Sequence, residues 1–166
     1  MLVTLILGLV PGVAGLWVWL DPIRRRKSSS GVPFLRVGTI DSLPADGVPR
    51  RFSVLADQTD AWTRTPRTSI GAVYLRRTAD GSPNGQLSAL NVVCPHAGCF
   101  VDYQNSRQGY LCPCHNSMFA LNGRVNAPSS PSPRGLDELP VEVRGREIWV
   151  QFQNFHTGRH DKVPLS

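Results

Sequence analysis

The stretch "NVVCPHAGCF" (residues 91–100), taken together with "CPCHNS" (residues 112–117), decides how this sequence is interpreted. The two stretches hold all four cysteines of the 166-residue chain and two of its four histidines. Each contains two possible metal ligands separated by one or two residues, and one further cysteine. These side chains are Cys94, His96 and Cys99 in the first stretch, and Cys112, His115 and Cys114 in the second. At such spacings a tight turn can direct both ligands of a pair at one centre.

Three kinds of chemistry use cysteines and histidines gathered in this way. A structural zinc site has mixed cysteine and histidine ligands. An iron-sulfur centre in which two histidines replace two cysteines on one iron needs the same donors. A cysteine nucleophile with a nearby histidine would leave three cysteines unexplained, so it is the weakest of the three interpretations.

The motifs Cys94-x-His96 and Cys112-x-x-His115, each with its additional cysteine, resemble the two cluster-binding boxes of the Rieske iron-sulfur proteins. Six positions and two spacings agree together, which makes the match more specific than a single pair of cysteines. The version with four cysteines and two histidines is similar to the Rieske subunit of the quinol:cytochrome c oxidoreductases, the cytochrome bc complexes. The resemblance implies a small antiparallel all-β domain whose loops bind a 2Fe-2S cluster.

The resemblance also assigns roles to the ligand pairs. Cys94 and Cys112 would ligate one iron as thiolates, and His96 and His115 would ligate the other through neutral nitrogens. Because fewer thiolates leave less negative charge on the cluster, the reduction potential rises. The two histidines would also contact a quinol and accept its proton, since their outer nitrogens can change protonation together with the electron.

The remaining two cysteines, Cys99 and Cys114, correspond to the pair that forms a disulfide between the two cluster loops in this subunit. Such a bond would close a loop of about fifteen residues and contribute about 3 kcal/mol to stability. It would also imply an oxidising compartment.

Three positions in or after the second box bear on the properties of the cluster. Ser117 matches a serine whose hydroxyl donates a hydrogen bond to a bridging sulfide, so we expect it to contact the cluster. Phe119 stands where high-potential members have a tyrosine, which predicts a lower potential. Asn116 stands where the family more often has glycine.

The N-terminal stretch "LVTLILGLVPGVAGLWVWL" (residues 2–20) has no charged residue in nineteen positions. As a helix it would span about 28 Å, close to the thickness of the hydrocarbon core of a bilayer. Trp17 and Trp19 stand where an interfacial aromatic belt would lie. The stretch therefore predicts a transmembrane anchor, with a cleaved signal peptide and a buried helix as weaker alternatives.

A basic cluster, Arg24–Lys27, follows the apolar stretch directly and supplies four of the eighteen basic residues. It accounts for much of the net charge of +6, so the charge indicates a lipid surface and not a nucleic acid. The positive-inside rule would place the following domain in the cytoplasm, whereas the expected disulfide requires the periplasmic side. We give the disulfide more weight, and expect a basic twin-arginine segment upstream of the given start. The expected organisation is an anchor (residues 1–20), a flexible basic linker (residues 21–33) and a Rieske domain (residues 34–166).

Short segments rich in β-branched and aromatic residues indicate that the rest of the chain is all-β. These segments are "FLRVGTI", "RFSVLA", "GAVYLRRT", "LSALNVV" and "EIWVQFQ", and in the last of them Ile148, Val150 and Phe152 share one face. Turns are expected at residues 80–85 and at Asn122-Gly123.

Four other features lie outside the two motifs and the predicted strands. The proline-rich residues 126–135 predict an irregular loop, either a plain surface loop or one that covers something. Residues 56–71 have the character of an insertion between strands, and Trp62 within them either packs on the domain or contacts a partner. His156 and His160 are expected to be ordinary solvated side chains. The tail of the chain, "NFHTGRHDKVPLS" (residues 154–166), has no counterpart in the resemblance.

The function implied is one-electron transfer from a membrane quinol to a c-type cytochrome, in a complex with cytochrome b at the bilayer. Nucleic acid is not an expected partner. Two alternatives stay open at this point: the small Rieske subunit of a periplasmic molybdenum oxidase such as arsenite oxidase, and a zinc-stabilised binding module without a redox role.

Overall fold

The computed structural model describes residues 15, 17, 31–60, 62–78 and 86–165. Residue contacts divide the chain into two units, residues 1–31 and residues 32–166, and the architecture given below is that of the second unit. The expected anchor and most of the expected linker lie outside the described residues, apart from Gly15 and Trp17, which are helical. No helix among the described residues is both long and apolar enough to cross a membrane.

The second unit is an all-β domain, which confirms the predicted fold class. Its strands are β1 (Phe34–Thr39), β2 (Arg50–Thr59), β3 (Arg64–Thr78), β4 (Gln86–Asn91), β5 (Asp102–Gln104), β6 (Gly109–Leu111), β7 (Met118–Ala120), β8 (Val141–Arg144) and β9 (Glu147–Gln151). Its described residues contain only two helical elements, the short 3-10 helices η1 (Ile40–Ser42) and η2 (Asn105–Arg107).

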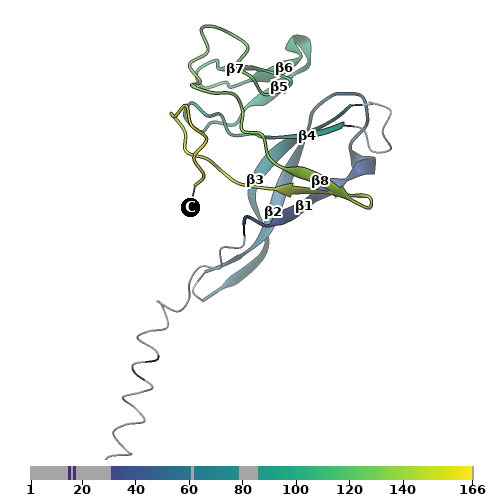
Figure 1. Cartoon of the computed structure of the whole chain (residues 1–166), viewed down its shortest axis with the longest axis vertical. Coiled ribbons are helices and arrows are strands. Elements are labelled where there is room, and N and C mark those ends of the chain that lie inside the picture. The colour runs from purple at the N-terminus through teal and green to yellow at the C-terminus, as the bar shows by residue number, and fades with distance from the viewer. Residues whose placement is uncertain (1–14, 16, 18–30, 61, 79–85, 166) are drawn as a thin grey trace, which may run out of the picture. The chain divides into compact units, whose positions relative to one another are not determined.

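The strands form three antiparallel sheets, in the orders β1-β9-β8, β2-β3-β4 and β5-β6-β7. Figure 1 shows the sheet of β5, β6 and β7 at one end of the domain, separated from β1 and β8. Two loops meet at this end: loop 1 (residues 92–101) connects β4 to β5, and loop 2 (residues 112–117) connects β6 to β7. The two sequence motifs are therefore brought together by a small sheet of their own.

Strand β9 shows how alternating side chains build the main core. Ile148 and Val150 are completely buried, whereas the residues that alternate with them are partly exposed. Phe152 continues this buried face, as the sequence predicted, and lies over Gly71 of β3. A Cβ atom at position 71 would come within 2.3 Å of the Phe152 ring, so this close contact requires a glycine.

A second hydrophobic cluster fills the end of the domain that carries the loops. Its buried members are Ala72, Tyr74, Leu90, Val92, Cys94, Val101, Tyr110, Cys112, Phe119 and Leu136. Tyr74 of β3 links this cluster to loop 1: its hydroxyl donates to the carbonyl oxygen of Val101 at 3.2 Å and accepts the N–H of Tyr103 at 3.1 Å. Burial raises the pKa of Tyr74, so the hydroxyl stays protonated and remains a donor.

Residues 56–71, expected to be an insertion between strands, are themselves part of two strands. They extend β2 and β3 into a long antiparallel hairpin, in which Ala56 pairs with Thr68 and Thr59 pairs with Arg64. The hairpin protrudes from the domain in Figure 1. Trp62, near its tip, is 97% exposed, so its side chain does not pack on the domain.

The expected turn at Asn122-Gly123 is present. The N–H of Gly123 donates to the carbonyl oxygen of Ala120 at 2.8 Å, and Gly123 has a φ of +80°, a conformation that favours glycine. Residues 126–135 contain neither strand nor helix, as predicted. The turn predicted at residues 80–85 lies outside the described residues.

Candidate metal centre

Loop 1 closes on itself through two main-chain hydrogen bonds. The N–H of Cys94 donates to the carbonyl oxygen of Cys99 at 2.8 Å, and the N–H of Gly98 donates to the carbonyl oxygen of Cys94 at 3.0 Å. Gly98 has a φ of +85°, in the left-handed region. The loop is thus a tight turn that begins at one cysteine and ends at the other.

Loop 2 repeats this backbone arrangement at the same spacing. The N–H of Cys112 donates to the carbonyl oxygen of Ser117 at 2.8 Å, and the N–H of Asn116 donates to the carbonyl oxygen of Cys112 at 3.0 Å. Asn116 has a φ of +58°, so it takes the place that glycine has in loop 1. The two loops are therefore the same turn with different side chains: the second cysteine follows the first by five residues in loop 1 and by two in loop 2.

Four possible metal ligands face one another across the two turns. Cys94 and Cys112 are free thiols and are 0% and 1% exposed. The imidazole rings of His96 and His115 have their centroids 4.8 Å apart and meet edge to face at 85°. His115 is exposed, whereas His96 is half-buried. The structure therefore pairs the two histidines across the loops and buries both thiols, with one imidazole at the surface.

The predicted disulfide is present between Cys99 and Cys114, whose Cα atoms are 6.6 Å apart. Its two sulfur atoms and that of Cys112 all lie within 4.8 Å of one another. Because the disulfide uses two of these sulfurs, only Cys112 among the three can donate a thiolate. The bond joins the two loops directly beside the free thiol of Cys112.

Two buried polar atoms at this place lack a protein partner. Nδ1 of His96 and the hydroxyl oxygen of Ser117 are both inaccessible and make no hydrogen bond within the described residues. Buried polar groups are nearly always paired, and an unpaired one calls for an explanation such as a bound ion. A metal at Nδ1 of His96 and a cluster sulfide at Ser117 would supply the missing partners, so the donor set fits an iron-sulfur cluster.

The electrostatic setting of Cys94 agrees with this fit. Burial raises the pKa of its thiol, the neighbouring Cys112 raises it further, and the main chain of His96 lowers it. A buried thiol whose ionisation is disfavoured in this way is stabilised as a thiolate by a metal ion, because the metal's charge compensates that of the sulfur.

The structure also locates the residues outside the ligand set that the sequence singled out. Phe119 is 1% exposed and belongs to the same hydrophobic cluster as Cys94 and Cys112. His156 and His160 are exposed, as expected for solvated side chains. No motif in the sequence distinguishes Asn91, which is 1% exposed and lies three residues before the first cysteine of loop 1. Its side chain accepts the N–H of Val93 at 3.0 Å.

An all-β domain with two Cys/His turns joined by a disulfide defines the class of proteins that hold a metal cluster between two loops. The profile of the Rieske 2Fe-2S domain matches residues 34–142 of this chain, and the chain belongs to that family. As a Rieske domain it binds a 2Fe-2S cluster, which supplies one-electron redox chemistry, and the zinc alternative is not supported.

Among curated proteins, the menaquinol:cytochrome c reductase iron-sulfur subunit of Geobacillus thermodenitrificans is 28% identical over 133 residues, covering 78% of this chain and 72% of that protein. The cytochrome b6-f complex iron-sulfur subunit of Chlorobaculum thiosulfatiphilum is 34% identical over 66 residues, covering 40% of this chain and 35% of that protein. This chain therefore spans only about a third of the length of the second relative.

A solved structure with a similar fold is the cyanobacterial plasma membrane Rieske protein from Synechocystis PCC 6803. It is 28% identical with a TM-score of 0.47, and the match covers 70% of this chain and 97% of that one.

Proposed function

We propose that the cluster is held by Cys94 and Cys112 on one iron and by His96 and His115 on the other. The observation that supports this assignment is the pairing of two buried free thiols with two imidazoles whose rings lie 4.8 Å apart. The unpaired Nδ1 of His96 is the nitrogen that would face the iron. Ser117 would donate its hydroxyl to a cluster sulfide, because its buried oxygen has no other partner in the described part of the chain.

The same geometry supports a contact between the histidines and a quinol. His115 is exposed, so an imidazole nitrogen that is not used for iron would be open to an incoming hydroxyl group. Neutral imidazole accepts a proton near physiological pH. A quinol that loses an electron also loses a proton, which His96 and His115 would receive.

The proposed electron transfer requires partner proteins that supply and accept the electron. We propose that the chain is the Rieske subunit of a cytochrome bc-type complex, which passes single electrons from a membrane quinol to a c-type cytochrome and has cytochrome b as a partner. The names of the Geobacillus and Chlorobaculum relatives support this proposal. The apolar residues 2–20 would anchor the chain in the bilayer, and the disulfide favours a domain on the extracytoplasmic side.

A mild-detergent purification of the tagged chain from its native membranes tests the complex. We expect b-type haem to purify with the chain, and we expect added quinol to reduce both the haem and the cluster, the latter followed by electron paramagnetic resonance (EPR). Metal analysis of the same sample distinguishes this complex from a molybdenum oxidase. Molybdenum in stoichiometric amount, with no haem, would replace this proposal with the molybdenum-oxidase alternative.

A further inference from the structure

Residues 153–165, which we call the strap, fold back on themselves beside loop 1. The N–H of His156 donates to the carbonyl oxygen of Val163 at 2.9 Å, and the N–H of Leu165 donates to that of Asn154 at 2.9 Å. Phe155 is 8% exposed and belongs to the main hydrophobic core. The strap is therefore an ordered part of the domain, although its sequence has no regular pattern.

The strap touches the main chain of loop 1 at the residues between the first cysteine and the first histidine. The N–H of Gly158 donates to the carbonyl oxygen of Pro95 at 2.8 Å. A Cβ atom at Gly158 would lie 3.8 Å from the carbonyl oxygen of His96, so the two main chains are in van der Waals range. On the other side, a Cβ atom at Gly98 would lie 3.8 Å from a methyl group of Thr157.

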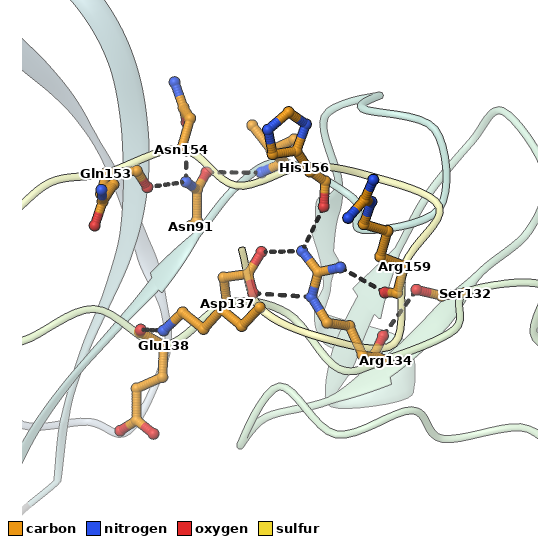
Figure 2. Close-up of polar contacts among 11 residues, drawn as sticks. Asn91, Ser132, Arg134, Asp137, Glu138, Gln153, Asn154, His156 and Arg159 are labelled. Carbon is orange, nitrogen blue, oxygen red and sulfur yellow. Dashed lines mark hydrogen bonds and ion pairs between the residues drawn. The ribbon is translucent and has the colours of Figure 1, made fainter. Parts of the chain in front are cut away.

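Arg134 holds the strap in this position. Its guanidinium group makes two hydrogen bonds to the carboxylate of Asp137, at 3.1 and 2.9 Å. It also donates to the carbonyl oxygen of Arg159 at 2.7 Å and to that of His156 at 3.1 Å. Figure 2 shows the guanidinium between the Asp137 carboxylate and these two carbonyls. Because His156 and Arg159 flank Gly158, the bonds from Arg134 fix the residue that contacts Pro95.

The side chains of Arg134 and Asp137 are 11% and 6% exposed. Burial of an ion pair costs several kcal/mol per ion unless further hydrogen bonds satisfy the charged groups. Here the carbonyl groups of the strap supply those further bonds. The strap therefore stabilises the buried ion pair, and the hydrogen bonds from Arg134 in turn hold the strap in place.

Asn91 ties the start of the strap to the entry of loop 1. Its side-chain amide donates to the carbonyl oxygen of Gln153 at 3.0 Å and to the side-chain oxygen of Asn154 at 3.1 Å. Its main-chain N–H donates to the carbonyl oxygen of Asp137 at 2.8 Å. As Figure 2 shows, Asn91 and Arg134 thus hold the strap at two separate places.

We propose that Arg134 is a positioning residue, which docks the strap on loop 1 and thereby keeps the segment Cys94–Cys99 from opening around the cluster. Arg134 reaches the loop only through the strap, by way of Gly158 and Pro95. The role holds whichever electron donor the cluster serves, so it goes beyond the function proposed above.

The proposal is tested in the cluster-loaded full chain by replacing both residues of the ion pair together. The double variant Arg134→Met with Asp137→Leu removes the bonds to the strap and leaves no buried charge unpaired. We expect trypsin to cut after Arg159 about tenfold faster or more, since the lost bonds come from a charged donor. We also expect the cluster absorbance to decay several-fold faster under a chelator, and the g-values of the reduced cluster to shift. The matched control is Arg146→Met with Asp41→Leu, an exposed pair between the turn that joins β8 to β9 and the 3-10 helix η1, which should match wild type.

A chain that ends at Phe155 separates an effect through the strap from general destabilisation. It lacks both carbonyl acceptors of Arg134 in the strap, as well as Gly158. We expect this shortened chain to lose its cluster faster than wild type. Adding the ion-pair replacement to the shortened chain should then change its rate of cluster loss by less than about twofold. Equal cluster decay and equal g-values in wild type and the double variant would overturn the proposal. An equally large effect of the replacement in the shortened chain would overturn it too, because Arg134 would then act without the strap.

Discussion

Asn116 donates its main-chain N–H to the carbonyl oxygen of Cys112 at 3.0 Å while it has a φ of +58°. Gly98 makes the corresponding bond to Cys94 in loop 1, with a φ of +85°. Asparagine is one of the few residues other than glycine that adopt this left-handed conformation at low cost. The departure from the usual glycine that the sequence shows at position 116 is therefore compatible with the same turn.

The conformation of Asn116 leads to a first prediction. Asn116→Gly should leave the stability of the domain unchanged within about 0.5 kcal/mol, whereas Asn116→Val should cost about 1–3 kcal/mol because a β-branched residue is strained there. Chemical unfolding followed by circular dichroism measures both. If the valine variant unfolded at the same denaturant concentration as the glycine variant, the turn would not depend on this conformation.

The second prediction concerns the ligands. Alanine at any one of Cys94, His96, Cys112 or His115 should abolish the EPR signal of the reduced cluster, because one iron then lacks a ligand. The exposed His156 is the matched control, since it lies outside the two loops. A normal spectrum in any of the four variants would remove that residue from the ligand set, and a lost spectrum in His156→Ala would show that the assay responds to folding alone.

The third prediction concerns the disulfide between Cys99 and Cys114. Cys99→Ser should still assemble some cluster, because neither residue is a proposed ligand, but the cluster should be lost faster since the two loops are no longer joined. Absorbance decay at fixed temperature measures the lifetime. An unchanged lifetime in Cys99→Ser would mean that the strap and the core hold the loops without the covalent link.

The fourth prediction concerns Tyr74, which connects β3 to loop 1 and β5. Tyr74→Phe removes the donor to the buried carbonyl oxygen of Val101 and the acceptor of the partly buried N–H of Tyr103. We expect a loss of about 1–3 kcal/mol in unfolding free energy. The partly exposed Tyr103 serves for comparison, because its hydroxyl bonds only to Asn105 in the described structure, and Tyr103→Phe should cost less.

The sequence predicted the parts of the fold that depend on side-chain pattern. The alternation in β9 identified a buried face, and six cysteines and histidines identified the two loops before any geometry was known. The hairpin at residues 56–71 was missed because a ribbon with two exposed faces needs no apolar alternation. Trp62 at its tip is accordingly exposed.

The strap was missed for a different reason. Its contacts with loop 1 use main-chain groups, such as the N–H of Gly158 and the carbonyl oxygen of Pro95, which any residue type could supply. The side chain that positions it, Arg134, lies in a proline-rich loop and looks like one of many surface arginines in sequence. Only its distance to Asp137 and its burial distinguish it.

The fifth prediction concerns Phe119, whose ring is buried beside loop 2. It pairs with Tyr110 across β6 and β7 and shares a hydrophobic cluster with Cys112. In high-potential relatives the family resemblance places a tyrosine here, whose hydroxyl donates a hydrogen bond to a cysteine ligand's sulfur. A phenyl ring has no donor, so we expect the more negative reduced cluster to be less stabilised in this chain.

Phe119→Tyr should therefore raise the reduction potential. Hydrogen bonds to charged groups contribute about 1.5–3 kcal/mol, of which only the difference between the two redox states counts, about 1–2 kcal/mol. For a one-electron couple this corresponds to roughly 40–90 mV. The wild-type potential should lie below the top of the Rieske range of about −150 to +300 mV, which suits a low-potential quinol such as menaquinol. Protein-film voltammetry on both chains measures the shift. If a folded, cluster-loaded variant showed no rise, Phe119 would serve only to pack the core behind loop 2, and the preference for menaquinol would lose its physical basis.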